Sequence, residues 1–132
     1  MTLAAVSQLL GARVAGNWRR EDAELVLTDF WSAPDLDRRV AEAFRNATLR
    51  VPISRSDLGI VGAALDARPR VSIASELPPA KGSGMWLRRF GADRSVAVPH
   101  VVGGVAVEVA AVALRGSSDD EAIRLLATLF HR

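Results

Sequence analysis

The chain has 132 residues, and its composition of 49% hydrophobic and 24% charged residues is typical of a folded globular domain and excludes a disordered one. It has no cysteine, which excludes disulfides, thiolate metal sites, cysteine nucleophiles and thioether-linked chromophores. The 17 basic and 15 acidic residues leave a net charge of +2, and the basic residues are scattered in short pairs, so we expect no nucleic-acid binding.

The sequence also gives no sign of membrane insertion. No uncharged run approaches the ~18 residues that are needed to cross a bilayer. The N-terminal stretch is apolar but has no basic segment in front of it, so it does not resemble a targeting signal. We expect residues 1–132 to form a single domain that is soluble and cytoplasmic.

Apolar periodicity predicts the first elements. Leu3, Val6 and Leu10 share one helical face, and Thr2 precedes them as a cap. Between residues 12 and 31, apolar residues alternate on both sides of a polar turn, which predicts a β-hairpin.

Capping residues predict where the later helices begin and end. Ser32 and Pro34 indicate the start of a second helix over residues 34–47. Gly91 has the position of a helix C-cap, and Ser118 begins an S-x-x-E capping box. The expected elements are helices over 2–10, 34–47, 57–68, 85–91 and from 118 onward, a hairpin over 12–31, extended segments over 49–54 and 70–75, a loop over 76–84, and strands over 94–100 and 104–114.

This order of elements predicts an α+β fold. Consecutive hairpins form antiparallel sheets, and helices from both chain ends and from the middle can cover the two faces of such a sheet. We therefore expect a central antiparallel β-sheet with helices packed on it.

Four segments of the second half resemble those of a GAF domain and occur in the same order. They are GIVGAAL (Gly59–Leu65), RPRVSI (Arg68–Ile73), FGADRSVAVP (Phe90–Pro99) and GVAVEVAAVAL (Gly104–Leu114). The resemblance implies that the N- and C-terminal helices lie on one face of the sheet, and that the middle helices and loops enclose a ligand cavity on the other face. It also implies a regulatory domain that senses a small molecule.

The chain departs from several branches of this family. GAF domains that bind bilin covalently and the free methionine sulfoxide reductases of this fold use cysteines, and the chain has none. The N-K-x-n-F-x-D-E motif of the cyclic-nucleotide binders has no counterpart. In the last long strand, Glu108 stands where the family often has a glycine.

Glu108 is the first candidate ligand-binding residue. Strand alternation places it with Ala106 and Ala110 on one face, where an unpaired carboxylate costs several kcal/mol. Two interpretations follow: a pocket group that holds a cationic ligand atom, or a residue paired with an arginine or exposed at a sheet edge.

His100 is the second candidate. One histidine suffices as an axial ligand of haem, whereas a metal cage needs more ligands, and the only other histidine is His131 near the C-terminus. We therefore predict no metal site, and the sequence identifies no cofactor. The alternative for His100 is an ordinary polar residue near a turn.

Aromatic residues are the remaining candidates. Under the resemblance, Trp31, Phe44, Trp86 and Phe90 lie around the cavity, although aromatic side chains fill cores more often than ligand sites. Trp86 follows the Pro/Gly-rich loop 76–84, which could act as a lid.

The terminal helices carry more leucine than one sheet contact requires. Leu3, Leu9, Leu125 and Leu129 predict a homodimer through these helices, because an exposed apolar stripe usually marks a partner. The alternative is a wide apolar face that the sheet buries completely.

The sequence thus leaves two functions open. The first is a GAF-type sensory domain that binds an unidentified small molecule and is the signal input of a signalling or transcription-regulating protein. The second is a ligand-free dimerisation module of the same fold. No catalytic constellation supports an enzyme. A cavity of ~300 Å³ or more beside Trp86 and the loop 76–84 favours the sensor, and a filled interior favours the module.

Overall fold

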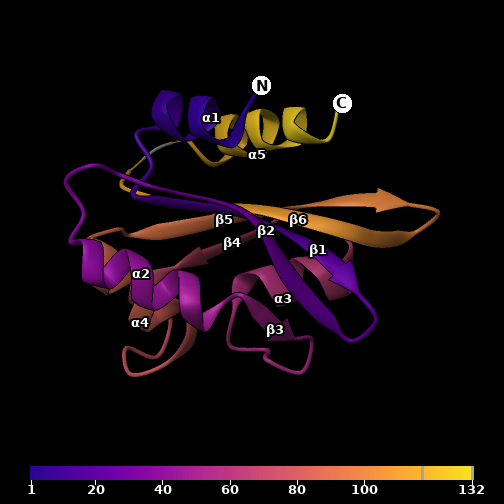
Figure 1. The fold of residues 1–132 in the computed structure, drawn as a ribbon, viewed down its shortest axis with the longest axis horizontal. Helices are drawn as coiled ribbons and strands as arrows, with labels where there is room; N and C mark the ends of the chain where they lie inside the picture. The colour runs from indigo at the N-terminus through magenta and orange to yellow at the C-terminus, as the bar shows by residue number, and fades with distance from the viewer. Residues whose placement is uncertain (117, 132) are drawn as a thin grey trace.

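The computed structural model describes residues 1–116 and 118–131. Within these residues, six strands form one antiparallel sheet in the order β3-β2-β1-β6-β5-β4 (Figure 1). The β1–β2 and β5–β6 hairpins meet in the middle of the sheet, where β1 pairs with β6. The strands are β1 (Val14–Glu21), β2 (Glu24–Ser32), β3 (Arg50–Pro52), β4 (Arg70–Ile73), β5 (Arg94–Val102) and β6 (Val105–Leu114).

Helices cover both faces of this sheet, which confirms the predicted α+β fold. On one face lie α1 (Leu3–Leu10), α5 (Asp119–Ala127) and the short 3₁₀ turn η2 (Thr128–Phe130). Figure 1 shows α1 and α5 side by side above the sheet, with both chain ends on that side. On the opposite face lie α2 (Arg38–Ala47), α3 (Gly59–Asp66), η1 (Ala74–Glu76) and α4 (Gly82–Phe90).

Three helix ends form as the sequence predicts. The Thr2 hydroxyl accepts a hydrogen bond from the Ala5 N–H at 3.1 Å at the start of α1, and the Ser118 hydroxyl accepts one from the Glu121 N–H at 3.3 Å at the start of α5. Gly91 ends α4 in the left-handed conformation, with φ of 71°. These caps satisfy backbone groups that have no partner inside their helices.

The predicted start of the second helix is wrong. Helix α2 begins at Arg38 and not at Pro34, and Ser32 ends strand β2 instead of capping a helix. The cap is Asp37, whose carboxylate accepts a hydrogen bond from the Arg39 N–H at 2.8 Å. Asp37, which directly precedes the apolar face of the helix, is the cap in place of Ser32 and Pro34.

The middle helices also differ from their predicted ranges. Helix α3 is shorter than residues 57–68, and strand β4 ends at Ile73. Helix α4 begins at Gly82, inside the segment that we predicted as a loop. Gly82 has φ of 60°, and a Cβ atom there would lie 2.3 Å from the Asp57 carbonyl oxygen. This glycine therefore permits the starts of α3 and α4 to lie against each other.

A β-bulge changes the expected alternation in β6. His100 pairs with Glu108, but the next residue of β5, Val101, pairs with Ala106, so Val107 has no partner of its own. Ala106 consequently packs in the same cluster as Val109, beneath the sheet, and not with Glu108 as predicted.

Each face of the sheet has its own core. One cluster lies between the sheet and α2, α3 and α4, and the other lies between the sheet and α1 and α5. Leu3, Leu125 and Leu129 are buried in the second cluster, whereas Leu9 is 65% exposed. Three of the four leucines that we expected in a dimer interface are therefore already buried within the chain, and the dimer stays a prediction.

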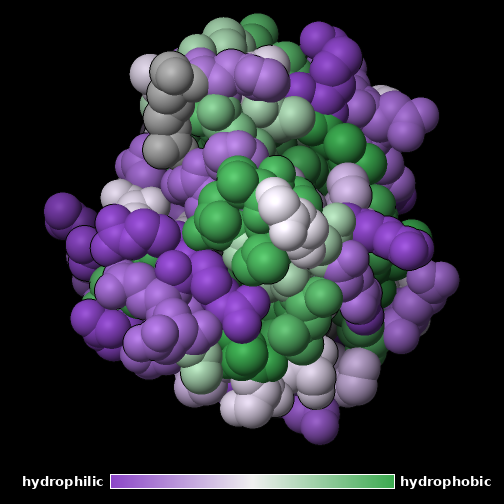
Figure 2. All heavy atoms as spheres, turned by 90° about the vertical axis from the view of Figure 1, so that its right-hand side faces the viewer, coloured by the Kyte–Doolittle hydropathy of each residue, from purple (hydrophilic) through white to green (hydrophobic). Residues whose placement is uncertain are grey.

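An apolar surface area lies at the tip of the β5–β6 hairpin. Figure 2 looks onto the side where this hairpin protrudes in Figure 1, and hydrophobic side chains gather near the centre of that view. The exposed residues are Val101, Val102, Val105 and Val107. Across the described residues, no helix is long and apolar enough to cross a membrane.

Candidate ligand-binding site

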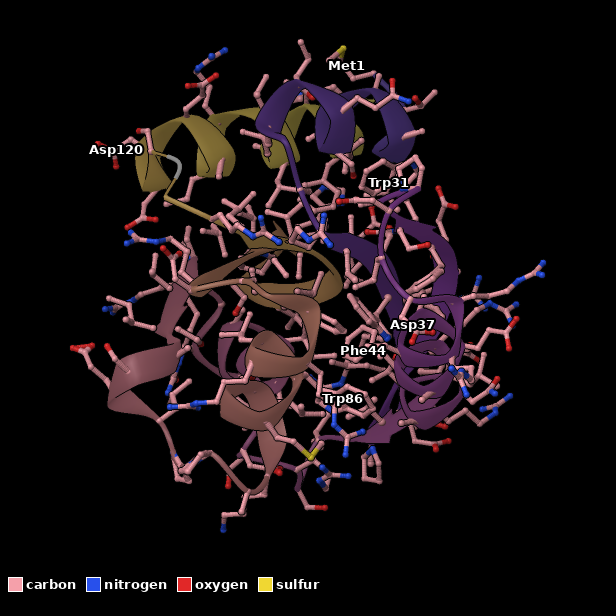
Figure 3. All side chains as sticks on the ribbon, turned by 90° about the vertical axis from the view of Figure 1, so that its left-hand side faces the viewer. Met1, Trp31, Asp37, Phe44, Trp86 and Asp120 are labelled. Carbon is pink, nitrogen blue, oxygen red and sulfur yellow. The ribbon has the colours of Figure 1, made fainter. Side chains whose placement is uncertain are left out.

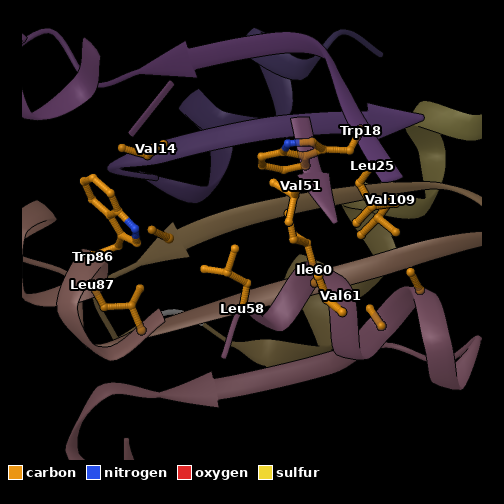
Figure 4. Packing of buried hydrophobic residues seen from close by; sticks show 14 of the residues in the cluster. Val14, Trp18, Leu25, Val51, Leu58, Ile60, Val61, Trp86, Leu87 and Val109 are labelled. Carbon is orange, nitrogen blue, oxygen red and sulfur yellow. The ribbon is translucent and has the colours of Figure 1, made fainter. Parts of the chain in front are cut away.

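An inner cavity of about 60 Å³ lies between the middle of the sheet and helices α2, α3 and α4. Its walls are mostly apolar and include Trp86 and Leu87 of α4, Leu58 at the start of α3, and Val14 of β1 (Figure 4). Small-molecule pockets usually measure about 300–1,000 Å³, and one water needs about 10–15 Å³. The inner cavity therefore accommodates a few water molecules but not a nucleotide or a haem.

Three predicted site residues come together at this cavity. Phe44 contacts Trp86 edge to face, with ring centroids 5.2 Å apart, and contacts Phe90 in the same way at 5.1 Å. Figure 3 shows Phe44 and Trp86 close together beneath the sheet, and the Arg89 guanidinium lies 5.2 Å from the centroid of Trp86. These aromatic side chains occupy much of the space that the GAF resemblance assigns to a ligand.

Trp18 forms a further part of the wall and is fully buried. Its indole N–H donates a hydrogen bond to the Thr48 carbonyl oxygen at 2.9 Å, which satisfies its polar atom and connects β1 to the end of α2. The indole ring lies over Gly16, where a Cβ atom would be 2.5 Å from the ring. Trp18 therefore has a packing role.

A second, outer pocket of about 290 Å³ lies between α3, β4 and the segment that leads into α4. It shares Leu58, Gly59 and Ser83 with the wall of the inner cavity. Unlike the inner cavity, it has polar walls, and it is located beside the predicted lid at residues 76–84. Its volume is close to the lower limit for a small-molecule pocket.

Serine hydroxyls gather where the two cavities adjoin. The Gly59 N–H donates a hydrogen bond to the Ser83 hydroxyl at 3.0 Å. A Cβ atom at Gly59 would lie 2.9 Å from the Ser72 hydroxyl and 3.8 Å from those of Ser83 and Ser95. The absence of a side chain at Gly59 therefore keeps this junction open between α3 and the sheet.

Two ion pairs border the outer pocket. Arg55 donates hydrogen bonds of 2.9 and 3.1 Å to the Asp57 carboxylate, and these bonds hold the pKa of Asp57 below its usual value. Arg70 lies 3.4 Å from the Asp66 carboxylate. Lys81 also lines the pocket, and it forms no ion pair with any described residue.

The other three predicted site residues lie on the opposite face of the sheet. Trp31 packs against the core beneath α1 and α5, and Figure 3 shows it near the helix layer and far from Trp86. His100 stacks on Phe130 of η2 and lies 3.3 Å from Glu108. The structure therefore does not bring them together with Phe44, Trp86 and Phe90. The reason is the strand register, which directs the Glu108 side chain away from the cavity.

Glu108 belongs to a largely buried polar network instead. Its side chain is 12% exposed and accepts a hydrogen bond from the Asn17 amide at 3.2 Å, while His100 Nδ1 lies 3.3 Å from its other oxygen. The Asn17 amide also donates to the Thr28 hydroxyl at 3.2 Å. In the part of the chain that the structure describes, no group of three acidic or histidine residues could hold a metal ion.

Sequence reasoning missed the polar residues of the outer pocket. Ser72, Ser83 and Lys81 have no motif of their own. Ser83 and Lys81 lie in the segment that we predicted as a loop, and Ser72 lies in the extended segment predicted over 70–75. One signal was available: Ser72 and Ser95 occupy inward-facing positions of strands, where alternation usually predicts an apolar residue. A serine at such a position indicates a polar surface inside the fold.

Comparisons with known proteins agree with this architecture at the level of the fold. No model of a known protein family matches the chain, and no curated protein matches it. Among solved structures, the GAF domain of a phosphoenolpyruvate-protein phosphotransferase from Coxiella burnetii is 15% identical, with a TM-score of 0.68, and the alignment covers 98% of this chain and 74% of that one. The GAF domain/HD domain protein of Geobacter sulfurreducens is 14% identical, with a TM-score of 0.68 and coverages of 98% and 83%.

Enzymes also share this fold. The type II free methionine-R-sulfoxide reductase of Thermoplasma acidophilum is 13% identical, with a TM-score of 0.65, and the alignment covers 96% of this chain and 82% of that one. At sequence identities this low, the matches establish only the fold of this chain. The sheet with its two helix layers superimposes on solved GAF domains over almost the whole chain. This chain therefore has the fold of a GAF domain.

Proposed function

We propose that the chain is a regulatory domain of GAF type that binds a small molecule beneath the sheet. The observation that carries this proposal is the outer pocket of about 290 Å³, which shares Leu58, Gly59 and Ser83 with the apolar inner cavity. A ligand with a polar end and a small apolar end would place the first in the outer pocket and the second toward Trp86. Such binding would bias the position of the helices that form the walls.

The proposed role is binding and not catalysis. Among the described residues, no histidine lines either cavity, and the one carboxylate at the outer pocket, Asp57, is paired with Arg55. In the proposed function, this domain binds the ligand, and other protein segments would carry out the response.

A thermal-shift screen tests this function. The panel contains neutral and anionic metabolites that are small enough for the outer pocket, and each is applied at a high concentration. A ligand present at 100 times its dissociation constant adds about 2.7 kcal/mol to the free energy of unfolding, which raises the melting temperature by several degrees. We expect at least one compound to produce such a saturable shift.

Two variants of α3 locate the binding site. Gly59→Ala places a methyl group 2.9 Å from the Ser72 hydroxyl, at the junction of the two cavities, and should abolish the shift. Leu65→Ala is the control on the same helix, because Leu65 is exposed and lines neither cavity. Equal shifts in both variants would contradict binding at this junction.

A ligand-free dimerisation module is the second candidate. The small inner cavity favours it, because Phe44, Trp86 and Phe90 already fill most of that space. This candidate predicts that no compound shifts the melting temperature and that the protein sediments as a dimer. Exposed Leu9 is the residue of the terminal helices to test, since Leu9→Glu would then produce a monomer.

A further inference from the structure

The starts of α3 and α4 both lie at the outer pocket. Leu58 precedes α3 and Lys81 precedes α4, and neither provides a side-chain cap for its helix. The first N–H groups of a helix carry a partial positive charge, because they have no partners within the helix. Two of these N–H groups already have acceptors, since Gly59 donates to the Ser83 hydroxyl and Ser83 donates to the Asp57 carbonyl oxygen. The remaining N–H groups and the partial positive charge of both helix starts favour a negatively charged occupant.

Ser72 gives an independent indication of a ligand at this position. Its residue is only 8% exposed, it lines the outer pocket, and its hydroxyl lies 2.9 Å from the Cβ position of Gly59 at the start of α3. Within the described residues, this hydroxyl has no hydrogen-bond partner. A hydroxyl that lines a pocket and has no partner in the protein is available to donate a hydrogen bond to a ligand.

Ser83 provides a second hydroxyl donor. Its oxygen accepts the hydrogen bond from the Gly59 N–H at 3.0 Å, and its own proton has no acceptor among the residues that the structure describes. The hydroxyl of Ser83 can therefore donate into the pocket while it holds the start of α3. Both hydroxyls would donate to an oxyanion.

The charged residues that line the outer pocket leave a net positive charge, which favours an anionic ligand. Asp57 is the one carboxylate in the lining, and Arg55 neutralises it with two hydrogen bonds. Asp66 balances Arg70 at 3.4 Å. Lys81 remains as a positive charge without an ion-pair partner in the described part of the chain.

We propose that the outer pocket is an oxyanion subsite, which binds the carboxylate or phosphate group of the ligand through Ser72, Ser83, Lys81 and the starts of α3 and α4. This inference rests on the proposed function and narrows its ligand to an anionic small molecule. The apolar part of that molecule would extend past Gly59 toward the inner cavity.

Nuclear magnetic resonance titrations with inorganic phosphate and with acetate test the subsite, with sodium chloride at equal ionic strength as the reference. We expect saturable shifts of the amide signals of Gly59, Ser83 and Gly84 with at least one of the two probes. The stronger probe identifies the headgroup as phosphate or carboxylate. The absence of saturable shifts with either probe up to about 50 mM, far above the range of weak millimolar binding, would overturn the proposal.

Two variants remove the proposed contacts. Lys81→Met removes the charge, and Ser72→Ala removes the unpaired hydroxyl, and each should weaken binding of the anion about tenfold. Arg39→Met, which removes an exposed charge on α2, and Ser75→Ala, which removes an exposed hydroxyl, are the matched controls and should leave the affinity unchanged. An equal effect of the controls would overturn the assignment, because it would indicate a general charge effect.

The outcomes separate the subsite from the proposed function. If neutral compounds of the screen bind, and Gly59→Ala prevents this binding while phosphate and acetate have no effect, the subsite is wrong and the function stands. If neither the screen nor the anions give a saturable signal, both are wrong. If anionic compounds bind with a dependence on Ser72 and Lys81, both are supported.

Discussion

The ring of His100 in β5 stacks on the ring of Phe130 at the end of η2, with centroids 4.9 Å apart and planes inclined by 11°. His100 also lies 3.3 Å from Glu108 of β6. The last turn of the chain is therefore held on the sheet by a ring that itself contacts a largely buried carboxylate. This contact joins the C-terminal helix layer to the polar network of Asn17 and Glu108.

We expect Phe130→Ala to loosen this attachment. The variant loses the stacked contact and part of the apolar area of the upper core, so the free energy of unfolding should fall by about 1–3 kcal/mol. Urea denaturation measures the loss, and amide hydrogen exchange should show faster exchange in η2. Phe130→Leu is the control, because it keeps the apolar volume without the ring, and a loss equal to that of alanine would contradict a role for stacking.

A larger side chain at Gly16 should disturb the wall of the inner cavity. In Gly16→Ala the new Cβ atom would be 2.5 Å from the Trp18 ring, and overpacking of this kind usually costs about 1–3 kcal/mol. Thermal denaturation and the fluorescence of Trp18 should both change. In the background of Trp18→Leu the same Gly16→Ala change should cost much less, and strictly additive losses would rule out the contact.

Ala67 is expected to be a site of stabilisation. It ends α3 in the left-handed conformation with φ of 52°, which costs an alanine roughly 1–2 kcal/mol. Ala67→Gly removes this strain but gives the unfolded chain more freedom, so the net gain should be about 0.5–1 kcal/mol. Ala47→Gly in α2, where the helical conformation suits alanine, should instead lower the melting temperature.

Asp93 should contribute stability that depends on pH. Its carboxylate accepts hydrogen bonds from the Gly116 N–H at 3.2 Å and from Arg94 at 3.1 Å, and these bonds lower its pKa below the usual value of 3.8. Because the folded pKa is the lower one, the contribution is complete above about pH 5 and is lost as the pH falls through the folded pKa.

Asp93→Asn tests this dependence, and the expected effect is small because the side chain is half exposed. At pH 7 the variant should have a lower free energy of unfolding than the original chain, and near pH 3 the difference should shrink. Asp120→Asn, in the exposed first turn of α5, is the control, because its carboxylate forms no ion pair or hydrogen bond with another described residue. A difference that stays constant with pH would contradict the assignment to the charge of Asp93.

The layers of the fold could be predicted from the sequence because each depends on local patterns. Alternation in the two long hairpins and the caps Thr2 and Ser118 predicted the sheet and the terminal helices correctly. The start of α2 could not be predicted with the same success, since Ser32 and Asp37 are both suitable caps and packing decides between them.

The candidate site was predictable only in part, because the face of a side chain depends on register. Phe44, Trp86 and Phe90 line the inner cavity, whereas Glu108 and His100 lie in the polar network on the other face, where His100 stacks on Phe130. The bulge at Val107 has no signature in the sequence and moves Ala106 to the cavity face. Glu108 keeps its predicted alternation with Ala110, but alternation alone does not decide which face of the sheet encloses the cavity. The outer pocket depends on the approach of α3 to α4, which is a tertiary contact.

Strand β6 separates the two cores of the fold. Its adjacent residues Val109 and Ala110 are both inaccessible to solvent, yet the first packs under the sheet and the second packs over it. Protein interiors are packed as densely as organic crystals, so a ligand that enlarged the inner cavity beneath the sheet would have to displace β6. Under the proposed function, such a displacement would reach the terminal helices, which pack on the other side of β6.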